Sequence, residues 1–249
     1  MRFLEGKAVV ITGAGSGLGA AYARHTAKLG AELVLNDVER AAVEGVAGEI
    51  KAAGGKAVVS VGSVSAWDYA AELIAACVSA YGRIDGLVNN AGILRHGRIT
   101  EMSERDLRAM LDVNTVGAAA CASHAIKAML QQDSHGSIVN VASGSQAGDI
   151  ALGGYGASKA AVASLTYTWA LELRDTKVRV NALSPLAHTA MAATNMQYLA
   201  QQSASREVVY TTLPAADVNA PAAAFLLSDN SIGINGQIVR IAGDELSFV

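Results

Sequence analysis

The chain has 249 residues, of which 51% are hydrophobic and 16% are charged, and its formal net charge is −3. Acidic and basic residues are scattered without a basic stripe, so we expect no nucleic-acid partner. No run approaches the roughly 18 apolar residues of a membrane helix, and the N-terminal segment reaches a glycine and charges too early for a signal peptide. We therefore expect a cytoplasmic protein with no membrane partner.

Short strands rich in valine and isoleucine alternate with longer, alanine-rich segments along the chain. This alternation predicts an α/β fold in which a doubly wound parallel sheet of about seven strands is flanked by helices on both faces. No linker divides the sequence, so we expect a single domain over residues 1–249. The expected strands are residues 7–11, 32–36, 56–60, 84–90, 137–143, 178–184 and 236–241. The expected helices include residues 17–30, 39–53, 66–80, about 103–131 and 153–174.

A glycine-rich segment, TGAGSGLG at 12–19, follows the first expected strand and precedes the first expected helix. Its glycines at 13, 17 and 19 fit G-x-x-x-G-x-G, whereas Leu18 stands where G-x-G-x-x-G requires its last glycine. Glycine allows a sharp turn and a close approach of the backbone to a pyrophosphate, whose charge the helix N-terminus favours. The segment predicts a dinucleotide-binding loop, although ordinary turns also use glycine.

An aspartate, Asp37, ends the second expected strand about 20 residues beyond the glycine loop. At this distance a carboxylate can accept hydrogen bonds from both hydroxyls of an adenosine ribose, and it would repel a 2′-phosphate. Ser16 and Val38 supply no positive charge for such a phosphate. We therefore expect NAD as the cofactor, with NADP less favoured. The alternative is an aspartate that only ends a strand at a turn.

A tyrosine and a lysine four residues apart, Tyr155 and Lys159, lie within an expected helix. Positions i and i+4 share one helix face, so both side chains project into the same space. A nearby ammonium group would lower the tyrosine pKa from its usual value of about 10 and so suit the phenol to acid–base work. A solvated surface pair has the same spacing.

In this order, the motifs resemble those of the short-chain dehydrogenase/reductase family over essentially the whole chain. They are TGxxxGxG at 12–19, NNAG at 89–92 and YxxxK at 155–159. The resemblance implies a Rossmann-like NAD(P)-binding domain, an oxidoreductase that interconverts a secondary alcohol and a ketone, and a substrate lid at about 186–212. It also implies a homotetramer, and the small residues of the helices at 103–131 and 153–174 allow close contact between copies.

Four residues match the family's catalytic set, namely Asn114, Ser143, Tyr155 and Lys159. The resemblance implies that Tyr155 is the general acid/base and that Ser143 holds the substrate oxygen. Lys159 would bind the nicotinamide ribose, and Asn114 would anchor a water that links Lys159 to solvent. Ser145 is the second candidate for the serine role.

The resemblance also assigns cofactor-binding residues from several loops. They are Gly13, Ser16, Gly17, Leu18, Gly19, Asp37, Ser63, Val64, Asn90, Ala91, Gly92, Tyr155, Lys159, Pro185 and Thr189. Asn90 is expected to tie the fourth and fifth strands together. Ser63 replaces the family's usual aspartate, and Leu186 replaces the glycine that usually follows Pro185, so adenine recognition and the geometry of this loop stay open. The chain also ends without the usual D-G-G.

The expected substrate-binding residues are Ser143, Ser145, Tyr155, Leu186 and His188. The favoured substrate is a small or medium secondary alcohol or ketone. The alternatives are a 3-hydroxyacyl or 3-oxoacyl thioester, and a non-catalytic dinucleotide sensor or scaffold, against which the complete catalytic set counts.

Other chemistry-bearing side chains stand around the expected pocket without a fixed role. Arg95 fits either an anionic substrate or solvent. His96 and His188 favour solvated loop positions, and Cys77 and Cys121 favour buried ones, because none of them has metal-ligand spacing. We therefore expect no metal site. Met191, Met196, Tyr198 and Tyr210 suit either an adaptable lid or ordinary packing.

Overall fold

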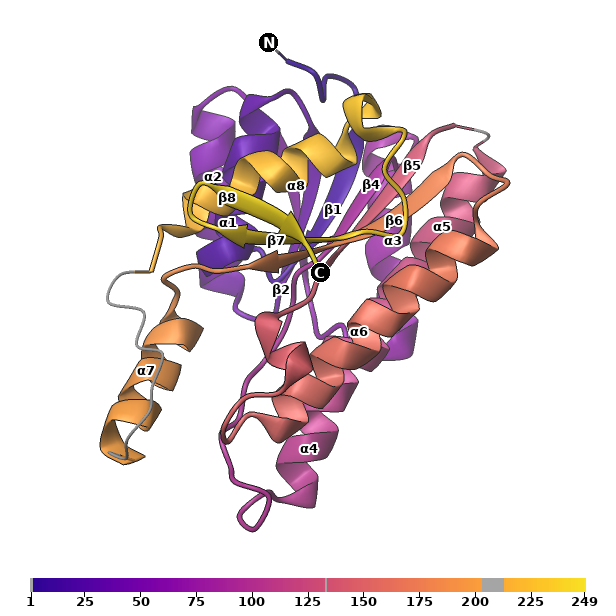
Figure 1. The fold of residues 1–249 in the computed structure, drawn as a ribbon. Helices are drawn as coiled ribbons and strands as arrows, with labels where there is room; N and C mark the ends of the chain where they lie inside the picture. Colours follow the sequence, from indigo (N-terminus) through magenta and orange to yellow (C-terminus); the bar gives the residue numbers. More distant parts are fainter. Residues whose placement is uncertain (1, 133, 203–212) are drawn as a thin grey trace.

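A sheet of eight strands runs through the molecule in the order β3-β2-β1-β4-β5-β6-β7-β8 (Figure 1). The computed structural model describes residues 2–132, 134–202 and 213–249. The strands are β1 Ala8–Thr12, β2 Glu32–Asp37, β3 Lys56–Val61, β4 Gly86–Asn89, β5 Gly136–Val141, β6 Val178–Pro185, β7 Ile238–Ala242 and β8 Glu245–Phe248. The pairs from β3 to β7 are parallel, and β8 pairs antiparallel with β7.

Helices occupy the segments between the strands, as the alternation of patterns predicts. They are α1 Gly17–Lys28, α2 Arg40–Ala52, α3 Trp67–Tyr81, α4 Glu104–Leu111, α5 Gly117–Gln131, α6 Gly153–Glu172, α7 Ala190–Gln202 and α8 Ala220–Leu227. A π-helical turn, Asp112–Val116, joins α4 to α5, and short 3-10 turns lie at Gly144–Ala147, Ala216–Asn219 and Asp229–Ser231. The predicted α/β fold with a doubly wound sheet is confirmed.

The eighth strand was not expected, because the prediction ended the sheet at residue 241. Gly243 adopts a left-handed φ of +69°, which lets the chain reverse after β7. All four residues of β8 are exposed, and the strand has no buried alternate face that would have marked it in the sequence. The sheet therefore ends in an antiparallel edge strand.

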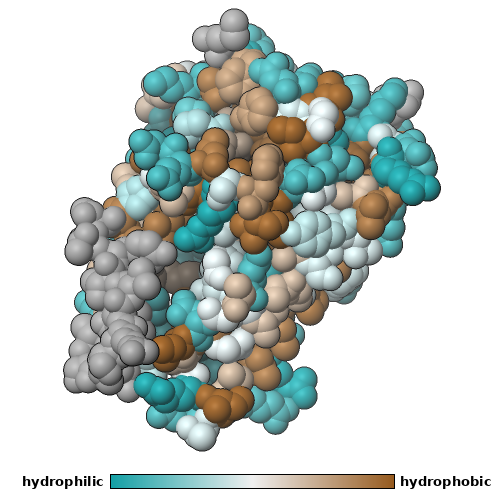
Figure 2. Space-filling model, viewed as in Figure 1, coloured by the Kyte–Doolittle hydropathy of each residue, from teal (hydrophilic) through white to brown (hydrophobic). Residues whose placement is uncertain are grey.

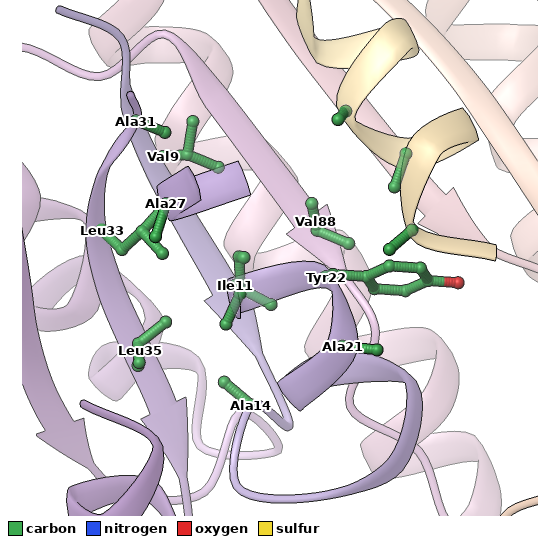
Figure 3. Packing of buried hydrophobic residues seen from close by; sticks show 14 of the residues in the cluster. Val9, Ile11, Ala14, Ala21, Tyr22, Ala27, Ala31, Leu33, Leu35 and Val88 are labelled. Atoms are coloured by element: carbon green, nitrogen blue, oxygen red, sulfur yellow. The ribbon is translucent and has the colours of Figure 1, made fainter. Parts of the chain in front are cut away.

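The core lies on both faces of the sheet, because successive strand residues point to opposite sides. Val9 and Ile11 pack beneath α1, α2 and α8, whereas Val10 of the same strand packs beneath α3 and α5. Figure 3 shows Tyr22 of α1 extending toward α8 across this core. Burial of each large apolar side chain contributes about 1.5–3 kcal/mol.

The strand order reverses at β1, because the chain first winds outward through β2 and β3 and then returns to β4 on the other side. In an open α/β sheet, ligands bind in the crevice that such a reversal opens at the carboxyl ends of the strands. The predicted site residues follow β1, β2, β4, β5 and β6 at this edge. The fold therefore brings them together from distant parts of the sequence.

Apolar side chains gather on the surface over α8 and the β7–β8 hairpin (Figure 2). A cavity of about 600 Å³ lies there, lined by residues that include Phe225, Leu246 and Phe248. Leu246 is 65% exposed and Phe248 is 69% exposed. None of the four predicted catalytic residues lines this cavity. Within the described ranges, no helix is long and apolar enough to span a bilayer.

Candidate functional site

The loop between β1 and α1 is held by close backbone approaches. Gly13 and Gly17 adopt left-handed φ values of +63° and +52°, and a Cβ at Gly19 would overlap the carbonyl oxygen of Gly13. Ser16 is the N-cap residue of α1, but its side chain makes no capping hydrogen bond. Leu18 packs against the core from the first turn. This helix start therefore has no capping side chain and can offer backbone N–H groups to an anion.

Asp37 lies at the end of β2 beside the glycine loop, as predicted. Its Oδ2 accepts a hydrogen bond from the Gly15 N–H at 2.9 Å, and its Oδ1 accepts one from the Glu39 N–H at 3.1 Å. Arg40, the nearest basic residue along the chain, forms an ion pair with Glu44 at 3.1 Å. The carboxylate is thus fixed where the glycine loop passes the end of β2.

Asn90, directly after β4, holds the glycine loop against the end of this strand. Its Nδ2 donates to the carbonyl oxygens of Thr12 at 2.9 Å and Gly13 at 3.0 Å. In return, Thr12 Oγ1 accepts hydrogen bonds from the backbone N–H groups of Asn90 and Ala91, each at 3.0 Å. Asn90 and Ala91 therefore belong to the wall of the glycine loop.

The prediction that Asn90 ties the fourth and fifth strands together is wrong. Asn89 makes that link, because its Nδ2 donates to Asn140 Oδ1 on β5 at 2.9 Å. Successive strand residues face opposite ways, so only one of two adjacent asparagines can reach β5 in this manner. The sequence alone gave no basis for choosing between Asn89 and Asn90.

Ser63 and Val64 follow β3 at the far side of the crevice. Ser63 Oγ lies 2.8 Å from Ser65 Oγ, and the hydroxyl is partly buried. Val64 is buried. A Cβ added at Gly117 would lie only 2.7 Å from Val64 Cγ2. Gly117 at the start of α5 thus lets Val64 sit close to that helix, while Ser63 presents a neutral hydroxyl in place of a carboxylate.

Ser143 and Tyr155 meet at the carboxyl end of β5. Ser143 caps the 3-10 turn Gly144–Ala147, and its Oγ accepts a hydrogen bond from the Ser145 N–H at 3.2 Å. Tyr155 stands in the first turn of α6, close enough to Ser143 for the serine hydroxyl to lower the Tyr155 pKa against the effect of burial. Ser145 instead directs its hydroxyl to Asp149 Oδ2 at 3.3 Å. The geometry therefore favours Ser143 over Ser145 as the partner of the tyrosine.

Lys159 lies one helical turn after Tyr155 and is only 4% exposed. Its Nζ donates to the Val141 carbonyl oxygen at 2.7 Å and lies 5.9 Å from the centre of the Tyr155 ring. Burial disfavours the charged amine and lowers the Lys159 pKa from 10.5 to about 8. The amine is therefore poised to exchange a proton near physiological pH.

The expected lowering of the Tyr155 pKa by Lys159 differs from what the structure gives. Burial raises the pKa of Tyr155, and the hydrogen bond with Ser143 opposes that rise. Desolvation of the phenol therefore outweighs the expected effect of the Lys159 charge. The phenol of Tyr155 is thus held in its protonated form at neutral pH.

Asn114 lies in the π-helical turn between α4 and α5, a kind of irregularity that is frequent at functional sites. Its Nδ2 donates to the Ile93 carbonyl oxygen and to Ser158 Oγ, both at 2.9 Å, and its Oδ1 accepts from the Ile93 N–H at 2.8 Å. A Cβ at Gly92 would lie 3.3 Å from Asn114 Oδ1 and 3.6 Å from Lys159 Nζ. Gly92 therefore keeps the space between these two side chains open.

The segment after β6 keeps its hydrogen bonds despite the unusual leucine. Pro185 pairs with Ile241 as the last residue of β6. The Leu186 N–H donates to the Ile241 carbonyl oxygen at 2.9 Å, and its own carbonyl oxygen accepts from Asn219 Nδ2 at 3.1 Å. His188 is exposed. Its N–H donates to the Pro214 carbonyl oxygen at 2.7 Å, and His188 forms an isolated bridge with Ala215.

Thr189 connects the start of α7 with the start of α1. Its Oγ1 accepts a hydrogen bond from the Ala192 N–H at 3.1 Å. A Cβ at Gly17 would lie 3.5 Å from the Thr189 methyl carbon. The segment after β6 and the glycine loop thus meet at Gly17, on the side of the crevice expected to receive the nicotinamide.

The proposed lid segment includes α7, which contacts the loop after β4. His96 Nε2 lies 2.9 Å from Asn195 Oδ1, and the His96 ring stacks on Tyr198 with ring centres 4.4 Å apart. These contacts join residues about 100 positions apart, which the sequence did not indicate. Residues 203–212 of the predicted lid, including Tyr210, lie outside the described residues.

Cys77 and Cys121 are both buried, and burial raises each thiol pKa to about 12. In the part of the chain that the structure describes, no group of three histidine, cysteine, aspartate or glutamate side chains could hold a metal ion.

Comparison with known proteins places this geometry in a family. The family model for short chain dehydrogenases matches residues 7–202. The chain is 34% identical to the 3-oxoacyl-acyl-carrier-protein reductase FabG of Thermotoga maritima, over 96% of this chain and 98% of that protein. The structure resembles NAD⁺-bound xylitol dehydrogenase with a TM-score of 0.89 and 28% identity, covering 96% of this chain and 99% of the other.

A second solved structure is similarly close. It is a short chain dehydrogenase from Burkholderia cenocepacia in complex with NADP, with a TM-score of 0.86, 28% identity and coverage of 97% and 98%. The fold of this chain matches these two solved structures over nearly their whole length. The chain belongs to the short-chain dehydrogenase/reductase family of oxidoreductases.

Proposed function

We propose that the protein is an NAD-dependent oxidoreductase that interconverts a secondary alcohol and a ketone, with Tyr155 as the general acid/base. The observation that carries the proposal is the placement of the buried Lys159, whose Nζ donates to the Val141 carbonyl oxygen at 2.7 Å and lies 5.9 Å from the centre of the Tyr155 ring, at the end of β5 where Ser143 follows. These groups lie at the carboxyl edge of a doubly wound sheet, close to a glycine loop that can receive a dinucleotide. We assign residues 1–249 to one domain of this kind.

A dinucleotide suits the residues at this edge. Side chains at Gly13 or Gly17 would strain the left-handed backbone, and α1 begins without a capping side chain. When bound, the nicotinamide supplies or receives two electrons and a hydrogen at the reacting carbon. Ser63, Val64, Asn90, Ala91, Gly92, Pro185 and Thr189 would complete the walls around it.

Asp37 supports NAD rather than NADP. Its carboxylate is fixed beside the glycine loop, where it can accept hydrogen bonds from ribose hydroxyls and repel a 2′-phosphate. Solved structures of the family carry either cofactor, so the local charge has to decide. Arg40 does not supply the needed positive charge, because it is paired with Glu44.

Tyr155 and Ser143 would act on the substrate oxygen. A phenol held in its protonated form can give its proton to the oxygen of a ketone during reduction. The Ser143 hydroxyl can donate a hydrogen bond to the same oxygen as negative charge develops there. Ser145, Leu186 and His188 would contribute to the surrounding substrate pocket.

Lys159 and Asn114 would restore the proton on Tyr155. The Lys159 pKa of about 8 allows its amine to give or accept a proton without a large change in pH. The space that Gly92 leaves between Lys159 Nζ and Asn114 Oδ1 supports the proposed water link toward solvent. In this scheme the π-helical turn positions the Asn114 amide.

A second candidate is the reduction of a 3-oxoacyl thioester by the same residues. The similarity to the Thermotoga maritima reductase favours it. The chemistry at the carbonyl group would be identical, and only the extent of the substrate beyond the pocket would differ. Turnover assays with a thioester beside simple ketones decide between the two substrates.

We also propose that the protein forms a homotetramer. Exposed apolar residues on α5 and α6, including Leu130 and Leu171, and the apolar surface over α8 and the β7–β8 hairpin support two separate interfaces. Apolar patches of this kind commonly mark contacts between subunits.

Replacement of Tyr155 by phenylalanine should lower kcat by about 100- to 10,000-fold, because the general acid is lost. NADH binding, followed by fluorescence titration, should be unchanged. Tyr167→Phe, on the same helix and 41% exposed, is the matched control and should keep full activity. Undiminished turnover by the Tyr155→Phe protein would contradict the assignment. An intact biological activity in a protein without turnover would instead indicate a dinucleotide sensor.

Replacement of Asp37 by asparagine should weaken NADH binding by about 10-fold and strengthen NADPH binding, because a charged acceptor is removed from the ribose site. Dissociation constants for both cofactors provide the measurement. Glu39→Gln removes the same charge two residues away and should leave the preference unchanged. Equal effects of the two substitutions on the dissociation constants would contradict a specific role of Asp37, and would indicate that only the net charge near the loop affects cofactor preference.

Replacement of Lys159 by methionine should change how stability depends on pH. Between about pH 8 and pH 10.5 the unfolded lysine binds more protons than the folded one, so wild-type stability rises with pH across this window. Relative to wild type, the Lys159→Met protein should therefore lose about 3 kcal/mol of unfolding free energy from pH 7 to pH 10.5. Denaturant unfolding at both pH values measures this, with the exposed Lys51→Met as control. A difference independent of pH would contradict the lowered pKa.

A further inference from the structure

Arg240 on β7 reaches across β6 toward the turn that begins at the predicted catalytic serine. Ile238 packs with Ala163 of α6, so Arg240, two residues further, lies on the α6 face of the sheet. Its Nη1 donates to Ser184 Oγ at 3.3 Å. A Cβ at Gly144 would lie 2.6 Å from the same nitrogen. The guanidinium therefore lies against the residue that directly follows Ser143.

Residues with short side chains, or none, flank Arg240. Its strand neighbours are the short side chains of Ser184 on β6 and Ser247 on β8. Gly144 is exposed and has no side chain that could cover the guanidinium. A glycine at this position thus allows the arginine to approach the turn.

The positive charge of Arg240 has no counter-ion among the described residues, where no carboxylate lies within 4.0 Å of it. The nearby turn contains Asp149, which is engaged with the Ser145 hydroxyl at 3.3 Å and the Ile150 N–H at 2.9 Å. Arg240 is partly buried, yet its side chain uses one of five N–H donors in a hydrogen bond to a described residue.

Arg179 on β6 shows how this fold engages the terminal nitrogens of an arginine that serves packing, although its Nε has no partner among the described residues. It is buried and donates to three backbone carbonyl oxygens, those of Leu226, Ser228 and Ile234, at 3.0–3.2 Å. Arg240 has no comparable set of acceptors in the described part of the chain. The contrast indicates that the free donors of Arg240 serve a ligand rather than the fold.

We infer that Arg240 is a specificity-determining residue that binds a carboxylate of the substrate, so that the preferred substrates are short oxo acids and the corresponding hydroxy acids. The inference rests on the proposed function, because it takes Ser143 as the group that holds the reacting oxygen. Consecutive Cα atoms are about 3.8 Å apart, so a group at Gly144 is close to one at Ser143. The planar guanidinium matches a carboxylate with two parallel hydrogen bonds.

The test compares matched acids and esters. Wild-type protein, Arg240→Gln, Arg240→Lys and the remote surface variant Arg174→Gln are assayed with NADH. The substrates are 3-, 4- and 5-oxo acids, the methyl ester of each acid, and simple ketones. Glutamine keeps a donor for Ser184 but removes the charge, and lysine keeps the charge but loses the planar fork.

Wild type should prefer at least one acid over its ester. In Arg240→Gln the KM for that acid should rise by about 10- to 100-fold, while the kinetics with its ester stay within about 2-fold. Arg240→Lys should fall between these proteins, and Arg174→Gln should match wild type. Malonate should raise the Tm of the NADH-bound wild type but not that of Arg240→Gln, which reports the anion site without turnover.

Equal kinetics with acids and esters, or equal effects of Arg240→Gln on both, would overturn the role of Arg240 while leaving the proposed function intact. Absence of turnover with every ketone, ester and acid would instead count against the proposed function. If malonate then also failed to discriminate wild type from Arg240→Gln, the anion site would be rejected as well.

Discussion

The arrangement of the site depends on one buried hydrogen bond, from the Lys159 amine to the carbonyl oxygen of Val141. It joins the first turns of α6 to the last residue of β5 and so brings Tyr155 to Ser143. Burial of this amine is unfavourable while it carries a charge, which is why its pKa falls to about 8. The same burial that fixes the geometry therefore also sets the protonation of the groups proposed to do the chemistry.

The part of the crevice around the loop after β1 depends on glycines, which have no side chain. Gly13, Gly17 and Gly19 let the loop after β1 fold against α1 and the corner after β4, and Asn90 locks that corner to the backbone of the loop. Asp37 is then held at the loop by two backbone N–H groups. The positive N-terminal end of α1 and the negative carboxylate of Asp37 lie on the two sides of one loop. This charge pattern is the one expected for binding a pyrophosphate and a ribose.

Much of this arrangement follows from the sequence, because local patterns indicate the fold class and the residues that match the family's catalytic set. The glycine loop, Asp37 and the Tyr155–Lys159 pair depend on spacing within one turn or one strand–helix unit, which a single sequence displays. Contacts between distant strands were not predictable in this way. The link made by Asn89 rather than Asn90, the approach of Arg240 to Gly144 and the stacking of His96 on Tyr198 all require the register of the folded chain. The prediction of a lowered Tyr155 pKa was wrong for a related reason, since the burial of the Tyr155 phenol, which raises its pKa, cannot be read from the spacing.

The central claim is that the crevice carries out hydrogen transfer between a nicotinamide and a carbonyl carbon, and isotope labelling tests it most directly. The purified protein would be incubated with NADH carrying deuterium at both C4 positions and a panel of ketones, oxo acids and a 3-oxoacyl thioester, with products examined by mass spectrometry. The account predicts an alcohol product with one deuterium on the carbon that bore the oxygen. Bound NADH that is never consumed, or an alcohol that forms without the label, would contradict it.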